Sequence, residues 1–167
     1  MSYTLLSIKD IEDKSKLKKF DCGNKELNEF FSHYALKNDI LGIGKTFVGI
    51  DDNKNVIGYF TLASAQVVFS DIPNEYSSSL PKHPIPALRI ARFAVSRALQ
   101  GKGIGKWMMS IALKKVIQVS EITGLYLVIV DAKETSKSFY EHFGFTPLSG
   151  NELSYFLPVE TIRKAIV

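Results

Sequence analysis

A glycine-rich turn between a strand and a helix constrains this chain more than any other sequence feature. Gln100-Gly101-Lys102-Gly103-Ile104-Gly105 follows the strand-like stretch Leu88–Val95 and precedes a helical stretch at 103–120. Glycines let the backbone approach a ligand closely, and the free N–H groups at a helix N-terminus attract anions. The turn therefore predicts a phosphate or pyrophosphate site, to which Lys102 and Lys106 add formal charge.

Two other phosphate motifs do not fit this chain. A dinucleotide fingerprint needs G-x-G-x-x-G, whereas the glycines here stand at 101, 103 and 105 and Trp107 follows. A P-loop needs a glycine five residues before Gly44-Lys45-Thr46, and Asp39 stands there instead.

The length of 167 residues predicts a single domain, 1–167. A content of 46% hydrophobic and 23% charged residues is typical of a soluble globular protein. Cys22 is the one cysteine, which excludes an intrachain disulfide, and no apolar run reaches membrane-spanning length. The three histidines show no metal-ligand spacing. We expect a cytoplasmic protein without a metal or membrane span.

Positive charge is concentrated around the glycine turn. The net charge is +4, yet residues 82–120 hold eight Lys and Arg and no Asp or Glu. Seven lysines also lie among residues 1–40, where seven acidic residues balance them. A one-sided block of this kind predicts a polyanionic ligand, although a solvated helix face remains an alternative.

Apolar periodicity predicts alternating strands and helices. Strands are expected at 3–8, 46–50, 56–63, 88–95, 125–130, 145–148 and 154–157, and helices at 24–38, 103–120, 134–143 and 158–166. Asn24 is a candidate cap for the first helix. The four prolines within residues 70–87 predict a long loop. This order predicts an α/β chain with a mixed sheet and helices on its faces.

Several motifs together resemble the GNAT acetyltransferases. Gln100-x-x-Gly103-x-Gly105 is similar to their acetyl-CoA motif, Q/R-x-x-G-x-G/A, and Phe139-Tyr140-Glu141-x-x-Gly144-Phe145 is similar to their FYE-x-x-GF signature. The element order also agrees with that family. The resemblance implies the GNAT acyl-CoA N-acyltransferase fold and acetyl-CoA as co-substrate.

The resemblance also implies roles for individual residues. Backbone amides from Gln100 to Gly105, with Lys106 beside them, would hold the CoA pyrophosphate, and Phe93, Ala94 and Val95 would pair with the pantetheine arm. Tyr140 would protonate the departing thiolate as a general acid. Lys133 stands where many members have asparagine, and Ser136 where a small alanine is usual. Both are expected near the cofactor, with Lys133 facing its phosphates.

A narrower resemblance is to the toxin-type, TacT- and AtaT-like members. The opening Phe20-Asp21-Cys22-Gly23-Asn24-x-x-Leu27-Asn28-x-Phe30-Phe31 is similar to their F-x-C-G-x-x-x-L-D-x-F-L pattern. Gly58-Tyr59-Phe60, Arg92-x-Ala94-Val95 and Val130-Asp131-Ala132 continue the likeness. Such enzymes acetylate the α-amine of charged tRNA, and many pair with a ribbon-helix-helix antitoxin. A homodimer is also implied.

The chemistry of the acceptor agrees with this subtype. The predicted strand 88–95 contains no carboxylate to serve as a base. An α-amine, with a pKa of about 7.7–8.0, needs less help than a lysine at about 10.4. The basic block and the N-terminal lysines are candidate contacts for tRNA phosphates. Two alternatives remain: a housekeeping GNAT acting on protein N-termini or small amines, and a non-catalytic acyl-CoA-sensing or RNA-binding module. Cys22 is expected to be structural rather than nucleophilic.

Overall fold

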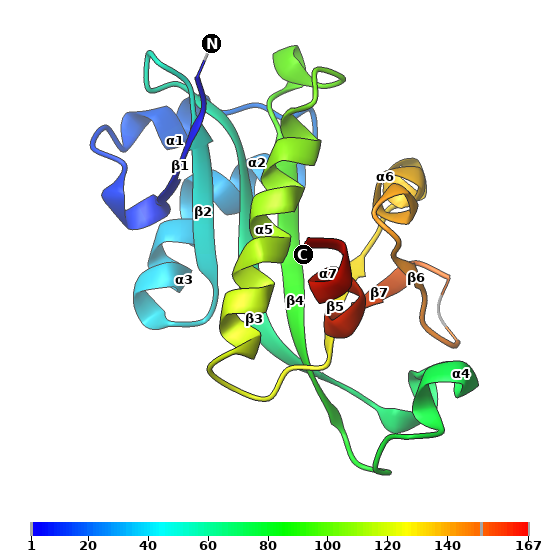
Figure 1. Ribbon diagram of the computed structural model, residues 1–167. Coiled ribbons are helices and arrows are strands. Elements are labelled where there is room, and N and C mark those ends of the chain that lie inside the picture. Colours follow the sequence, from blue (N-terminus) through cyan, green and yellow to red (C-terminus); the bar gives the residue numbers. More distant parts are fainter. Residues whose placement is uncertain (1, 151, 167) are drawn as a thin grey trace. The chain divides into compact units, whose positions relative to one another are not determined.

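The computed structural model describes residues 2–150 and 152–166. Within them the strands form a mixed sheet in the order β1-β2-β3-β4-β5-β7-β6 (Figure 1). The pairs β1–β2, β2–β3, β5–β7 and β6–β7 are antiparallel. The pair β4–β5 is parallel. The predicted mixed sheet is confirmed. The strands are β1 (Thr4–Ser7), β2 (Lys45–Ile50), β3 (Val56–Val67), β4 (Ile85–Val95), β5 (Leu127–Asp131), β6 (Thr146–Pro147) and β7 (Ser154–Pro158).

Helices occupy several of the segments outside these strands. They are α1 (Ser15–Lys19), α2 (Lys25–Glu29), α3 (Ala35–Leu41), α4 (Asn74–Ser77), α5 (Ile104–Ser120), α6 (Lys137–His142) and α7 (Val159–Ile166). Short 3-10 turns lie at Ile8–Asp10, Phe69–Asp71, Arg97–Leu99 and Glu134–Ser136. No helix in the described part of the chain combines the length and the apolar character that a membrane crossing requires.

The expected helix at 24–38 is confirmed in three parts. Asn24 caps α2, its side-chain oxygen accepting the N–H of Leu27 at 3.0 Å. A π-helical turn at Phe30–Tyr34 joins α2 to α3. The preceding helix α1 was not predicted, because it is short and mostly lysine, and propensity alone is a weak signal over five residues.

The prediction that residues 70–87 form a long loop is wrong in part. They contain α4, and β4 already begins at Ile85. Pro73 occupies the N-cap of α4, where the missing N–H of proline is tolerated. Tyr76 of α4 packs edge-on against Phe156 of β7 at 5.3 Å, so the segment has its own apolar contacts.

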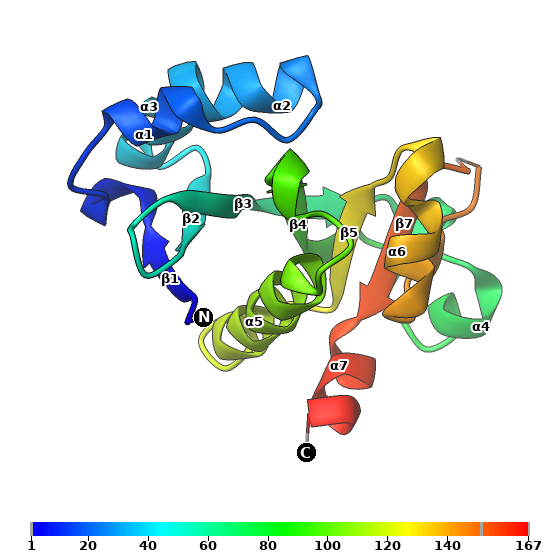
Figure 2. The same cartoon turned by 90° about the horizontal axis from the view of Figure 1, so that it is seen from above.

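The chain divides into two compact units. The first runs to Ala63 and includes Ala91–Ala112; the second contains Ser64–Ile90 and the chain from Leu113 onward. In the first unit, α1, α2 and α3 lie on one face of β1, β2 and β3, and the N-terminal part of α5 lies on the other (Figure 2). Trp107 of α5 contacts the β2 strand at Gly49, where an added Cβ would lie 3.1 Å from its ring.

Aromatic rings form the centre of the first unit. Phe31 stacks on Tyr59 with ring centroids 4.4 Å apart, and Phe20 packs edge-on against both. The Tyr59 hydroxyl donates to the carbonyl of Leu27 at 2.7 Å, which satisfies its polar atom inside an apolar cluster. Gly58 leaves no room for a side chain, since a Cβ there would lie 2.8 Å from the Ala94 carbonyl oxygen. The packing thus explains the Gly58-Tyr59 pair of the motif.

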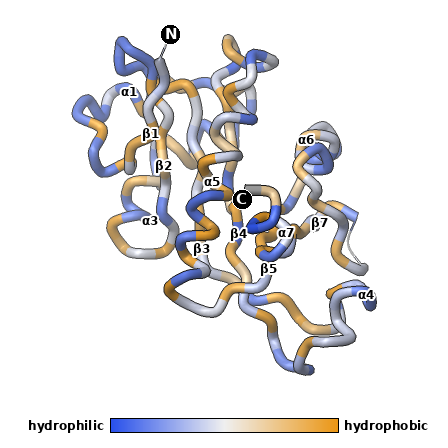
Figure 3. Tube along the Cα trace, in the orientation of Figure 1, coloured by the Kyte–Doolittle hydropathy of each residue, from blue (hydrophilic) through white to orange (hydrophobic). Residues whose placement is uncertain are grey.

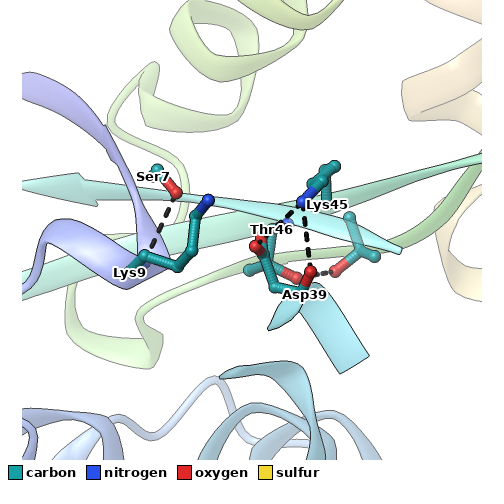
Figure 4. Close-up of polar contacts among 6 residues, drawn as sticks. Ser7, Lys9, Asp39, Lys45 and Thr46 are labelled. Atoms are coloured by element: carbon teal, nitrogen blue, oxygen red, sulfur yellow. Dashed lines mark hydrogen bonds and ion pairs between the residues drawn. The ribbon is translucent and has the colours of Figure 1, made fainter. Parts of the chain in front are cut away.

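A buried acid fixes the end of α3 to β2. The Asp39 side chain is 1% exposed, and its Oδ2 accepts the Thr46 N–H at 3.0 Å (Figure 4). Its Oδ1 lies 3.4 Å from the Lys45 ammonium group. The hydroxyls of Thr46 and Thr61 hydrogen-bond to each other at 2.7 Å. Asp39, which stands where a P-loop requires glycine, is therefore a structural clamp that joins α3 to β2.

The second unit has a separate apolar core. In register, Ala87 to Ile90 of β4 pair with Leu127 to Val130 of β5, and β7 pairs with the other edge of β5. The buried members of this core are Val67, Ile72, Ile85, Ala87, Leu127, Ile129 and Phe156. β5 is buried from Leu127 to Val130, as its uninterrupted apolar run predicts.

Helix α5 carries the amphipathic stripe that its sequence predicts. Hydrophobic and hydrophilic stretches alternate along it in Figure 3. Ile104, Met108, Ala112 and Val116, spaced by four residues, are each at most 2% exposed. This buried stripe anchors the helix whose N-terminus carries the glycine turn.

Candidate active site

The glycine turn has the backbone that an anion site requires. Gly101 and Gly103 have φ angles of 78° and 86°, in the left-handed region that favours glycine. No heavy atom would lie within 4 Å of a Cβ at either position. Glycine is therefore required at both positions by conformation rather than by crowding.

The start of α5 supplies backbone amides that have no helical partners. The Trp107 N–H donates to the Gly103 carbonyl at 3.1 Å, which closes the first turn and leaves the preceding N–H groups without helical partners. Lys102 and Lys106 are exposed beside them, whereas Ile104 is 2% exposed and anchors the helix. Amides, helix dipole and ammonium groups together suit a pyrophosphate.

Gln100 has a structural task that sequence reasoning did not identify. Its Nε2 donates to the carbonyls of Cys22, at 2.9 Å, and Val95, at 3.0 Å. The side chain thereby connects the loop before α2 to the end of β4. The family motif allows glutamine or arginine at this position, and both offer several N–H donors. The Nε2 donors of Gln100 are therefore engaged by protein carbonyls, and its predicted cofactor contact falls to the backbone.

The opening motif forms a hydrogen-bonded turn next to Gln100. Asp21 accepts the Gly23 N–H at 2.8 Å and the Asn28 amide at 3.0 Å, and Asn28 in turn accepts the Cys22 N–H. The Gly23 N–H, the Asn28 amide and the nearby Arg97 charge lower the pKa of Asp21. Cys22 is buried among apolar residues, which favours its structural role. The motif therefore supports the base of the glycine turn.

The residues predicted to pair with pantetheine lie at the end of β4. The register with β5 ends at Ile90 and Val130, whereas β4 continues through Phe93, Ala94 and Val95. Phe93 stacks on Phe60 with centroids 6.3 Å apart, and Ala94 is buried. The Val95 carbonyl accepts the Gln100 Nε2 at 3.0 Å, and the predicted pairing of these residues with pantetheine stays a prediction.

Tyr140 lies on α6 in the second unit. Its ring is buried, with 7% of the residue exposed, and packs edge-on against Phe145 at 5.7 Å. Its hydroxyl has no hydrogen-bond partner among the described residues. Every fully buried side-chain N or O atom of the described residues does have a partner. The Tyr140 hydroxyl is therefore not fully buried, and it is the end of the side chain that reaches the surface. Burial raises the pKa of Tyr140 to about 12, so the phenol keeps its proton at neutral pH.

Lys133 and Ser136 form a local turn before α6. The Ser136 hydroxyl accepts the Lys133 N–H at 2.9 Å and donates to its carbonyl at 3.1 Å. The Lys133 side chain is exposed. Ser136 thus shapes the entry to α6, and the predicted cofactor contacts of both residues stay predictions.

Asp131 of the Val130-Asp131-Ala132 motif stands at the end of β5. It lies 2.6 Å from an Arg89 guanidinium nitrogen and accepts the Ser154 hydroxyl at 3.0 Å. Each of its oxygens therefore has one protein partner, and the carboxylate links β5 to β4 and β7.

Comparison with known proteins identifies the family of the chain and several similar structures. The model of the acetyltransferase (GNAT) domain family matches residues 11–155. A relative from Mycobacterium tuberculosis described as a "tRNA-acetylating toxin" is 29% identical over 157 residues, covering 93% of each chain. A solved structure described as "AtaT complexed with acetyl-methionyl-tRNAfMet" has a TM-score of 0.90 and 27% identity, over 99% of this chain and 100% of that one. A mutant AtaT toxin bound to acetyl-CoA and the C-terminus of the antitoxin AtaR has a TM-score of 0.84 and 26% identity, over 100% and 99%.

The chain belongs to the GNAT acetyltransferase family. The predicted fold, enzyme class and acetyl-CoA co-substrate are confirmed. The likeness to toxin-type members, noted from the opening motif, is confirmed by these relatives.

Proposed function

We propose that this chain transfers an acetyl group from acetyl-CoA to the α-amine of aminoacyl-tRNA and acts as the toxin of a toxin–antitoxin pair. The proposal is supported most directly by one observation: its likeness to tRNA-acetylating proteins extends over essentially the whole chain. A ribbon-helix-helix antitoxin, a homodimer and a cytoplasmic location, where charged tRNA occurs, accompany the proposal.

Bound acetyl-CoA supplies a thioester as the acetyl donor. The backbone amides from Gln100 to Gly105 hold its pyrophosphate, and the end of β4 carries the amides and carbonyls for its arm. Lys102 and Lys106 strengthen the attraction for phosphate. These groups belong to the backbone and to exposed lysines, so they are in place before the acceptor arrives.

Tyr140 completes the transfer. The neutral amine attacks the thioester carbonyl, the new C–N bond replaces the C–S bond, and the sulfur leaves as a thiolate that takes the phenolic proton of Tyr140. The surplus proton of the amine passes to water. An α-amine with a pKa of about 7.7–8.0 is substantially neutral near pH 8. The transfer therefore needs no carboxylate base on β4, which has none.

Purified protein, labelled acetyl-CoA and a pool of charged tRNA test the proposal, with uncharged tRNA as control. We expect label on the charged pool alone, released with the amino acid by mild ester hydrolysis. Label on protein N-termini or small amines, with charged tRNA left bare, would refute the tRNA assignment and favour a housekeeping GNAT. Acetyl-CoA binding without transfer to any amine would refute catalysis.

A further inference from the structure

A basic cleft in the first unit lies outside the residues assigned to acetyl-CoA. It has a volume of about 430 Å³ and opens between α1, the beginning of β3 and the 3-10 turn after β4. Lys16, Lys19 and Arg97 line it, together with the polar residues Asn55 and Ser96. None of the residues from Gln100 to Lys106 contributes to its lining.

The cleft joins two basic segments that are distant in the sequence. Lys16 and Lys19 come from the lysine-rich α1, and Arg97 comes from the basic block at 82–120. Within the described residues, none of the three forms an ion pair with a carboxylate. No described carboxylate lies within ion-pair distance of them, and Asp13 acts on the two lysines, and Asp21 on Arg97, only at longer range.

The remaining contacts hold the cleft in shape without neutralising it. The Lys16 ammonium donates to the carbonyls of Asn53 and Lys54 at 3.0 and 2.9 Å, which are uncharged partners. Asp21 also lines the cleft, but its Oδ1 already accepts two hydrogen bonds from the opening turn. Three cations and one carboxylate line the cleft, so its lining carries a net positive charge.

The chemistry of the lining selects phosphate groups. Ammonium and guanidinium groups, with hydroxyl and amide side chains between them, are the usual protein contacts of a nucleic-acid backbone. Arg97 also lies only three residues before Gln100, whose side chain connects the opening turn to β4. We infer that this cleft binds backbone phosphates of the RNA acceptor, at a place separate from the CoA pyrophosphate turn. The inference rests on the proposed function.

A double variant, Lys16→Gln with Lys19→Gln, tests the cleft, because among the described residues neither of these two lining lysines has a hydrogen bond or ion pair with the opening motif that supports the glycine turn. The matched control is Lys9→Gln with Lys18→Gln, which removes two exposed lysines of the same unit that do not line the cleft. Three quantities are measured for each: the Kd for unfractionated tRNA over a range of salt, the Kd for acetyl-CoA, and acetylation of an aminoacyl-adenosine that lacks the rest of the tRNA.

We expect the cleft variant to bind tRNA about 10-fold more weakly than the control. The slope of log Kd against log salt should also fall by roughly 1.5, because about 0.7–0.9 is lost per phosphate contact. Affinity for acetyl-CoA and acetylation of aminoacyl-adenosine should equal those of the control.

Two results would overturn the inference while leaving the proposed function intact. In the first, the wild type labels charged tRNA, but the cleft variant and the control variant bind tRNA with equal Kd. The other is an acetyl-CoA Kd that rises in the cleft variant alone, which would assign the cleft to the cofactor. A wild-type chain that leaves charged tRNA unlabelled would instead refute the proposed function, and with it the RNA ligand.

Discussion

Replacing Tyr140 by phenylalanine removes one oxygen and leaves the ring. The ring carries the packing contacts of the residue, including the edge-on contact with Phe145. The hydroxyl has no hydrogen-bond partner among the described residues. The free energy of unfolding should therefore change by no more than about 0.5 kcal/mol, the range of substitutions that touch no packing or polar partner.

The same change should strongly affect turnover. Burial raises the pKa of the phenol to about 12, so the wild type presents a protonated acid throughout the pH range of an assay. General acid catalysis contributes about 10²–10⁴-fold. We expect kcat to fall about 100-fold, while the KM for acetyl-CoA stays within about 3-fold, because the oxygen acts on the leaving thiolate rather than on the ground state.

The assay follows thiol release from acetyl-CoA with a charged tRNA pool between pH 6 and pH 10. The wild-type rate should rise with ionisation of the acceptor amine and show no loss through Tyr140 below about pH 10. Tyr126→Phe is the matched control, because Tyr126 is a second phenol of the same unit whose pKa burial raises, and it lies outside the FYE-x-x-GF signature. Equal kcat in Tyr140→Phe and Tyr126→Phe would refute the general-acid role.

Three further predictions concern the turn, the clamp and the opening motif. Gly103→Glu should weaken acetyl-CoA binding by about 10-fold or more in calorimetry, because it strains a left-handed residue and adds negative charge at an anion site; unchanged affinity would remove the turn from the cofactor site. Asp39→Ala should cost about 2 kcal/mol in urea unfolding, since it deprives the Thr46 N–H of its acceptor, whereas Lys45→Ala should cost less than about 1 kcal/mol because Lys45 is half exposed. Equal costs would contradict the clamp. Asp21 has a lowered pKa, so its contribution to stability is present above its unfolded value of 3.8 and is lost as pH falls through the folded value. Asp21→Asn should therefore unfold with a weaker acid dependence than the wild type, and an identical pH profile would count against the turn.

Much of the fold was predictable because its strongest elements carry long periodic patterns. The stripe of α5 extends over 17 residues, and the apolar run of β5 is rich in β-branched residues, so each indicates one element type. Short elements were missed for the opposite reason. Helix α1 has only five residues, and α4 lies among prolines that predict a loop. Their stability comes from tertiary contacts, such as Tyr76 on Phe156, that no local pattern encodes.

The candidate site also contains features that the sequence predicts and features that it does not. Glycines with a required backbone, such as Gly101 and Gly103, have a sequence signal because few other residues adopt their conformation. The contact of Gln100 with Cys22 joins residues 78 positions apart in the chain, and the pairing of Arg89 with Asp131 joins residues 42 positions apart. Such pairs can be identified only from the folded structure. The sequence therefore predicts the glycine turn but not the side-chain contacts that support it.

The central claim is that the acetyl group ends on the α-nitrogen of a tRNA-bound amino acid. Ribonuclease digestion of charged tRNA treated with this protein and acetyl-CoA, followed by mass spectrometry of the released aminoacyl-adenosine, measures this directly. We expect a species heavier by one acetyl group, with the acetyl on the α-amine, and we expect less of it with Tyr140→Phe. Aminoacyl-adenosine of unchanged mass, from protein that consumes acetyl-CoA on another amine, would contradict it.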